Sequence, residues 1–404
     1  MADDEREQFE LVYRQNFRAV LRYALARVEP EAARDAAQWR KDLILGMIKR
    51  RLGIAAVMAL AVAGLSAGSA SAATQPAPEA EVAWQAAIAQ VAEPGHGCYS
   101  ASYPALAWHA VTCVAAPDVP FVPAPPSRSA RHAGPQTVGD THDFSARVPG
   151  LISRATGTFR HVSPGITVKG AVLGSASMAD NGFSLQLNSQ NVTGSPACSG
   201  SSDPSGCIAW QQFLYAYDAG SALNGGNPSS SYIFMQYWLI SYGYTCPSGW
   251  AADGQGDCYI NSQAAEVNAV TASQLATLQF SGTATPGGND GVSLSVGSGQ
   301  ATMVTASDSM IDLAQHWNTT EWGLFGDGDG DEAYFGANTS LQPQTALTAS
   351  SGPSAPKCIY AGTTGETNNL KLTTTPKLGS QSAPTMATKQ TNGTSKTPSC
   401  AVTS

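Results

Sequence analysis

Basic residues are missing from the middle of the chain, because no lysine or arginine occurs between Lys169 and Lys357. That stretch holds fourteen Asp and Glu residues, and charged residues make up only 13% of the whole sequence. A surface of this sign repels phosphate backbones, which excludes a nucleic-acid partner for this part of the chain. The carboxyls become protonated near about pH 3 to 4, so their repulsion falls and we expect a domain that tolerates acid. A soluble, acidic exported surface is the alternative explanation.

Motifs of several common enzymes are also absent. No Gly-x-Ser-x-Gly occurs and the six histidines are scattered, which argues against a Ser/His/Asp hydrolase. No Cys-x-x-Cys or metal-type histidine pair occurs, so we expect neither a metal nor another cofactor. The turn from Asp327 to Asp331 alternates Asp with Gly, but Glu332 and Asn338 stand where an EF-hand requires Gly and Glu. We interpret it as a solvated acidic turn, with a loose calcium turn as the alternative.

Eight cysteines are present, and all of them follow residue 73. An even number confined to one part of the chain indicates disulfides, and therefore an oxidising compartment. The simplest expectation pairs neighbours in the sequence: Cys98 with Cys113, Cys198 with Cys207, Cys246 with Cys258, and Cys358 with Cys400.

Residues 47–72 have the three parts of a secretory signal peptide. Met47–Leu52 is basic, Leu52–Leu65 is apolar, and Ala70–Ala72 matches the small-x-small pattern of a cleavage site. We therefore expect a secreted, extracellular protein that keeps no stable membrane anchor after cleavage. In the alternative, the apolar stretch is retained as an anchor, but it is short for a membrane span.

Residues 1–46 precede this leader, and they are either a fragment with a mis-assigned start or a fused helical stub. Apolar side chains recur at helical spacing from Phe9 to Ala24. Phe9–Tyr13, Phe17–Ala24 and Pro30–Asp35 resemble the start of region 2 of extracytoplasmic-function sigma factors. The resemblance covers residues 1–38 and implies a short helical N-terminal extension. A sigma-related transcription role is a remote alternative, because no helix-turn-helix pattern follows.

The exported part divides into four segments by composition. Residues 136–349 show short alternating patterns, such as Leu185 and Leu187 between polar residues, and turns rich in Gly and Asn. We predict an antiparallel β-sandwich or jelly roll of the concanavalin-like type, with Tyr232–Ile240 as a strand covered on both faces. A helix is expected within residues 307–317. The other segments are a disulfide-bonded pro-segment (73–114), a Pro-rich linker (115–135) and a loosely ordered Ser/Thr-rich tail (350–404). The basic residues Arg128 and Arg131 after the prolines suit a processing site, so the part before residue 136 is either a propeptide or a second permanent module on a linker.

Two polar residues stand out because their surroundings are apolar. Gln236 lies in the middle of an apolar strand, so its amide is either a structural tether or a functional group that faces a groove. Glu321 lies between Trp317 and Trp322, and a carboxyl among aromatic rings suits a general acid or an acid-active base. A satisfied core residue is the alternative for each.

This part of the chain resembles the eqolisin-type glutamic peptidases, which are secreted, acid-active β-sandwich enzymes with a catalytic Gln/Glu pair. The resemblance rests on Phe234–Trp238 and on Thr320–Trp322 followed by Ala333–Phe335. It implies Glu321, Gln236 and Gln212 as catalytic residues, with Gln186 and Gln211 as other sources of the amide, and Trp238, Trp317 and Trp322 as substrate-binding residues. Gln236 departs from the family, which has Glu at this place in the aromatic strand.

Two functions therefore remain open for the exported part. The first is an acid-tolerant, glutamic-peptidase-like endopeptidase, or a degenerate relative of one, acting on extracellular protein. The second is a non-catalytic module that binds glycan or cell-wall polysaccharide through exposed rings of Trp210, Trp250 or Trp322.

Overall fold

The computed structural model describes residues 79–124, 137–171, 178–217, 230–297, 299–393 and 399–400. The sigma-like fragment and the predicted signal peptide lie outside these residues. The chain divides into two units, and nearly all of the described residues belong to the second, Ala73–Ala252 with Gly256–Ser404. No helix in the described ranges is long and apolar enough to cross a membrane.

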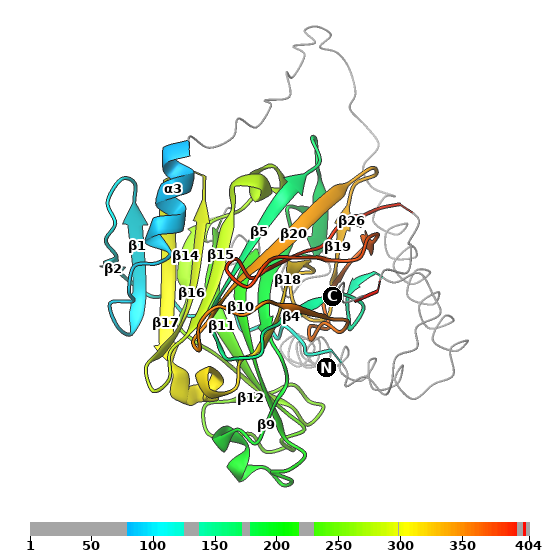
Figure 1. The fold of residues 1–404 in the computed structure, drawn as a ribbon. Helices are drawn as coiled ribbons and strands as arrows, with labels where there is room; N and C mark the ends of the chain where they lie inside the picture. The colour runs from blue at the N-terminus through cyan, green and yellow to red at the C-terminus, as the bar shows by residue number, and fades with distance from the viewer. Residues whose placement is uncertain are drawn as a thin grey trace, which may run out of the picture. The chain divides into compact units, whose positions relative to one another are not determined.

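Two large antiparallel sheets build this second unit (Figure 1), which confirms the predicted mostly β, sandwich-type fold. The first sheet has the strand order β2-β1-β17-β16-β15-β5-β20-β25-β24, and the second has the order β12-β13-β11-β10-β8-β18-β4-β21. The strands of the first sheet are β1 (Gly97–Ser102), β2 (His109–Val111), β5 (Ile152–Val162), β15 (Gln279–Ala284), β16 (Asn289–Val296), β17 (Gln300–Ser307), β20 (Ser340–Ala349), β24 (Lys377–Leu378) and β25 (Thr385–Ala387), with β23 (Lys371–Leu372) and β26 (Gln390–Thr391) paired beside this order. Those of the second are β4 (Ser145–Arg147), β8 (Ser184–Ser189), β10 (Ile208–Tyr217), β11 (Ser230–Ile240), β12 (Ala251–Ala252), β13 (Cys258–Asn261), β18 (Thr319–Phe325) and β21 (Lys357–Ile359), with β9 (Val192–Thr193) and β14 (Ala265–Asn268) paired beside it.

Alternating apolar side chains from both sheets form the main core. Leu187, Phe213 and Trp322 project from the second sheet, and Phe280 projects from the first. The Trp322 ring stacks on Phe280 with the ring centroids 5.7 Å apart, and it also contacts Phe159. Each fully buried ring contributes about 2 to 3 kcal/mol of transfer free energy, so this alternation fixes which face of each strand turns inward.

The segments on both sides of the predicted sandwich contribute strands to it. In the expected pro-segment, β1 pairs with β17 and extends the first sheet at its edge. Helix α3 (Glu79–Ile88) lies beside this edge, where Gln85 Nε2 donates to Thr277 O (Figure 1). The tail, expected to be loosely ordered, instead supplies β21 and β25, which pair with β4 and β20.

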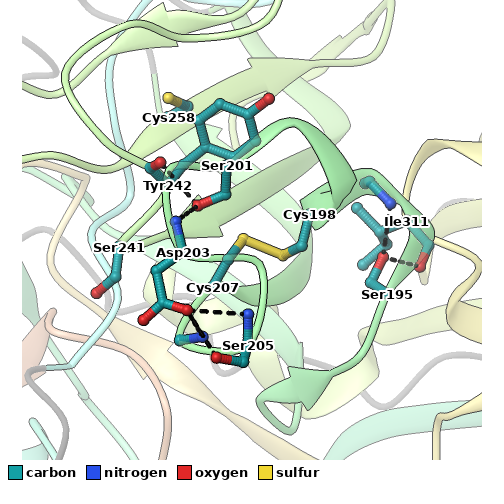
Figure 2. Close-up of a disulfide and its surroundings, with 12 residues drawn as sticks. Ser195, Cys198, Ser201, Asp203, Ser205, Cys207, Ser241, Tyr242, Cys258 and Ile311 are labelled. Carbon is teal, nitrogen blue, oxygen red and sulfur yellow. Dashed lines mark hydrogen bonds between the residues drawn. A yellow bond between two sulfur atoms is a disulfide. The ribbon is translucent and has the colours of Figure 1, made fainter.

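Each disulfide joins two cysteines with no other cysteine between them in the sequence, as expected: Cys98–Cys113, Cys198–Cys207, Cys246–Cys258 and Cys358–Cys400. Figure 2 shows the Cys198–Cys207 bridge inside a loop that side-chain hydrogen bonds also hold. There Ser195 Oγ donates to Ile311 O, and Ser201 Oγ donates to Tyr242 O. The bridge therefore ties a loop whose backbone is already anchored to two distant segments.

The prediction of one helix within residues 307–317 is wrong. Two short 3-10 turns, Asp308–Met310 and Leu313–Gln315, occupy this region. Asp312 has a left-handed backbone (φ 63°), which a continuous right-handed helix does not allow. The Asp308 carboxylate accepts the Ala314 N–H at 2.9 Å, so a side chain replaces the backbone acceptor.

Candidate functional site

One row of polar side chains crosses six adjacent strands of the second sheet. Cross-strand pairing places them opposite one another from β13 to β4, in the order Asn261, Gln236, Gln212, Asn188, Glu321 and Ser145. Their neighbours along the strands, such as Phe213 and Leu187, lie in the inter-sheet core. Because side chains alternate along a strand, the whole row projects from the opposite face of the sheet. The four central members, from Gln236 to Glu321, are nevertheless at most 1% exposed, so other parts of the chain cover this face.

Glu321 is held by one side of its carboxylate. Its Oε2 accepts hydrogen bonds from Asn188 Nδ2 (3.1 Å), Thr363 N (2.8 Å), Thr363 Oγ1 (3.2 Å) and Thr364 N (3.2 Å). The strand β18 presents the side chain, and the loop 360–366, here called the tail strap, supplies three of the four donors. This arrangement leaves Oε1 to interact with a different group.

That group is Asp143, a buried residue just before β4, whose carboxyl lies beside that of Glu321. Burial raises the pKa of the Asp143 carboxyl well above its usual range, and the charge of Glu321 raises it further. Asp143 Oδ1 and Glu321 Oε1 have no hydrogen-bond partner in the described part of the chain. The Asp143 carboxyl therefore keeps its proton to a higher pH than an exposed aspartate does.

Gly362 of the tail strap lies directly against this pair. A Cβ atom at this position would be 1.8 Å from Asp143 Oδ1 and 2.4 Å from Glu321 Oε1. Only a glycine lets the strap approach both oxygens this closely.

A chain of amides connects the carboxyl pair to a third buried carboxyl, that of Glu366. Asn188 Nδ2 and Gln212 Nε2 donate to Gln186 Oε1 at 3.1 and 3.2 Å, and Gln186 Nε2 donates to Glu366 Oε2 at 3.3 Å. Burial raises the pKa of Glu366 to about 7, although its hydrogen bonds oppose this rise. Asn188 Oδ1 and Gln212 Oε1 have no hydrogen-bond partner among the described residues. The face therefore combines acidic groups with amides that retain hydrogen-bonding capacity.

Gln236 holds a second covering segment, residues 117–124, here called the proline segment. Its Oε1 accepts the Phe121 N–H at 2.7 Å, and its Nε2 donates to Val119 O at 3.0 Å. Asn261 Nδ2 donates to Pro117 O at 2.9 Å. These amides therefore bind the backbone of an extended chain, much as a neighbouring strand would. This segment comes from the expected linker, and the structure packs it onto the sheet.

The tryptophans predicted to bind substrate lie elsewhere than expected. Trp317 and Trp322 point into the inter-sheet core, against Phe213 and Phe280, so the prediction that their rings surround the Glu321 carboxyl is wrong. Adjacent strand residues point to opposite faces, which separates Trp322 from Glu321. Trp238 does lie on the site face, where its Nε1 donates to Gln236 Oε1 at 2.9 Å.

The predicted glutamines fall into three groups. Gln211 faces the inter-sheet core beside Asp290, away from the row. Gln186 and Gln212 belong to the amide chain that leads to Glu321. Gln236 is three strands away from Glu321, which is roughly 14 Å at about 4.8 Å per strand. Gln236 and Glu321 are therefore too far apart to form one catalytic pair.

A small cavity lies beside Asp143. Its lining includes Trp322, Thr345 and Gln390, and its volume of about 10 Å³ corresponds to about one water molecule. Asp143 therefore borders a space that one water molecule can fill.

The turn from Asp327 to Asp331 supports the two covering segments. Asp329 N donates to Pro120 O at 2.7 Å, and Gly330 N donates to Glu366 Oε1 at 3.1 Å. In the described ranges no group of three or more His, Cys, Asp or Glu residues is arranged to hold a metal ion. The turn from Asp327 to Asp331 therefore has a structural role through its backbone contacts, which the interpretation as a solvated turn did not include.

Sequence reasoning missed Asp143, Asn188 and Glu366. Asn188 carried a usable signal, because Ser184, Gln186 and Asn188 alternate with apolar residues along one predicted strand. This alternation places their three polar side chains on the same face. Asp143 and Glu366 lie in loops with no periodic pattern, and only the fold brings them to Glu321 and Gln186.

The comparisons with known proteins add no relative. No protein-family model matches the chain, and no curated protein matches it.

Proposed function

We propose that this protein is an exported, acid-active hydrolase of peptide bonds in which Asp143 and Glu321 form the catalytic pair. The main support is the buried pair of adjacent carboxyls, Asp143 and Glu321, whose facing oxygens both lie against Gly362 and which stands beside a row of amides. The four disulfides support a function in an oxidising, exported environment. The resemblance to glutamic peptidases agrees with this chemistry, with Asp143 taking the place of Gln236 as the partner of Glu321.

The proposed reaction uses one ionised and one protonated carboxyl. The carboxylate takes a proton from water while the water oxygen forms a bond to the peptide carbonyl carbon. The protonated carboxyl then gives its proton to the amide nitrogen as the carbon–nitrogen bond breaks. Asp143, whose pKa is raised by burial, is the proton donor, so activity falls as pH rises through that raised pKa.

Peptide rather than glycan is the better-supported substrate. Together, Gln236 and Asn261 already bind an extended backbone through one N–H group and two carbonyl groups. The glycan alternative required exposed rings, but Trp210 is fully buried and Trp322 is 4% exposed. A binding role for polysaccharide thus loses two of its three candidate rings.

The described conformation is closed over the catalytic pair. The tail strap contacts Glu321 directly, and the proline segment contacts the tail strap through Ala124 N and Thr363 O at 2.8 Å. Activity therefore requires these segments to move. The basic residues Arg128 and Arg131, just after the proline segment, are the expected place of a processing cut.

The test is cleavage of a denatured protein at pH 3 by the chain cut between residues 127 and 131. We expect Glu321→Gln and Asp143→Asn each to lower the rate by at least about 100-fold, since either change removes one proton-transfer group. Glu266→Gln, an exposed carboxyl on strand β14 (Ala265–Asn268), is the matched control and should retain the full rate. Full activity of both site variants would reject the pair, and an inactive wild-type chain would favour a non-catalytic binding protein.

A further inference from the structure

The proline segment lies on the site face as a bound peptide would. Its backbone is read at three points by side chains of two strands, because Gln236 binds Val119 O and Phe121 N, and Asn261 binds Pro117 O. Tyr259 OH adds a contact to the Asp118 carboxylate at 3.1 Å. Backbone contacts of this kind bind an extended chain of almost any sequence.

A single side chain of the segment is fully buried, and it supplies the selectivity. The Phe121 ring fills a pocket formed by Leu214, Ala216, Phe234 and Ala264. It meets the Phe234 ring edge-on, with centroids 6.1 Å apart. Val119 and Val122 are partly buried against neighbouring clusters, and no other residue of the segment is fully buried. A pocket that closes around one aromatic ring with backbone-binding amides beside it is a specificity site for peptides.

We propose that residues 117–124 are an intramolecular ligand, and that the groove they fill binds extended peptides with an aromatic side chain at the Phe121 position. This inference rests on the proposed function only in naming the substrate class of that hydrolase; peptide binding itself requires no catalysis. It also gives the segment a regulatory role, because a tethered occupant competes with any peptide in solution.

The tether explains why the intact chain keeps the groove filled. Upstream, Val114 pairs with Ala264, and the Cys98–Cys113 bridge holds the chain just before it. Downstream, Val122 N donates to Glu366 Oε1 at 2.8 Å and Gly365 N donates to Val122 O at 2.7 Å. Attachment at both ends gives the segment an effective concentration on the order of millimolar, which a free peptide has difficulty matching.

The experiment measures binding of a fluorescent peptide with the sequence of residues 115–125 by polarisation. The protein is the full chain with Phe121→Ala and a cut between residues 127 and 131, so that its own occupant is weakened and free at one end. Glu321→Gln is included to prevent cleavage. The competing probe is the same peptide with alanine at the phenylalanine position. Lys169→Gln, an exposed residue of strand β6 (Val168–Ala171), is the matched control for the protein.

We expect the phenylalanine peptide to bind about 10- to 100-fold more tightly than the alanine peptide, from the burial of one ring. Gln236→Ala should weaken the phenylalanine peptide by about 10-fold, and Lys169→Gln should leave it unchanged. Equal binding of the two peptides, or no binding, overturns the proposal. If Phe121→Ala prevents folding, the cut wild-type chain replaces it, and hydrogen exchange of the Phe121 amide should rise when excess free peptide displaces the segment. If the cut chain that retains Glu321 binds the peptide but does not cleave protein in acid, the hydrolase is rejected and the peptide-binding groove is supported. If it cleaves protein but does not prefer the phenylalanine peptide, the groove is rejected and the hydrolase is supported.

Discussion

Replacing Glu366 by glutamine should flatten the dependence of folding stability on pH. Burial raises the pKa of this carboxyl from 4.5 to about 7 in the folded protein. The folded state therefore holds a proton that the unfolded chain releases, and the stability that this provides is complete below pH 4.5 and lost as pH rises through 7. At about 1.4 kcal/mol per pKa unit, the loss amounts to about 3 kcal/mol.

The assay is urea unfolding of the wild-type chain and of Glu366→Gln at pH 4.5 and pH 8. The absolute stability of the variant at pH 4.5 should fall by about 1 kcal/mol, because the new amide faces Gln186 Nε2, a donor. The informative quantity is the difference between the two pH values, which should be smaller in the variant by about 3 kcal/mol. Other carboxyls titrate in both proteins and cancel from this comparison.

Glu266→Gln is the control, because this side chain is exposed. Its pH dependence should match the wild type within about 0.5 kcal/mol. Parallel curves for wild type and Glu366→Gln would refute the reasoning, since they would mean that the folded and unfolded chains titrate this group alike.

Three further changes probe the same architecture. Gly362→Ala should destabilise the fold by about 1 to 3 kcal/mol, because its Cβ meets both site carboxyls, whereas exposed Gly393→Ala should cost less than about 0.5 kcal/mol in the same urea assay; equal costs would contradict the close approach. Asp290→Asn should raise the thermal midpoint at pH 8 more than at pH 4, because burial first and Asp308 second raise the pKa of this buried carboxyl; an equal shift at both pH values would count against it. Trp322→Ala should cost about 3 to 5 kcal/mol by urea unfolding, since the ring is packed between Phe159 and Phe280, and a cost below about 1 kcal/mol would place it outside the core.

The strands within residues 136–349 could be predicted from local patterns, whereas the strands of the tail, such as β21 and β25, could not. Tyr232–Ile240 is apolar on both faces because the inter-sheet core covers one side and the proline segment, through Phe121, covers the other. The cysteine pairs followed from sequence order because each pair closes a local loop. Local patterns of this kind depend on residues close in the chain.

The site required information that local patterns lack. Asn188 and Glu321 are 133 residues apart and meet only because β8 pairs with β18. The placement of Trp322 near the Glu321 carboxyl failed because closeness in sequence does not mean a shared face on a strand. Asp143 and Gly362 reach the site through loops, whose course depends on the whole fold.

The rate of peptide-bond cleavage as a function of pH tests the central claim most directly. It is measured with the chain cut between residues 127 and 131, on a peptide with a central phenylalanine, from pH 2 to pH 8. The account predicts a loss of activity as pH rises through the raised pKa of Asp143, and a rate at least about 100-fold lower in Glu321→Gln. Cleavage that shows no such fall up to pH 8, or that keeps its full rate in Glu321→Gln, would contradict it.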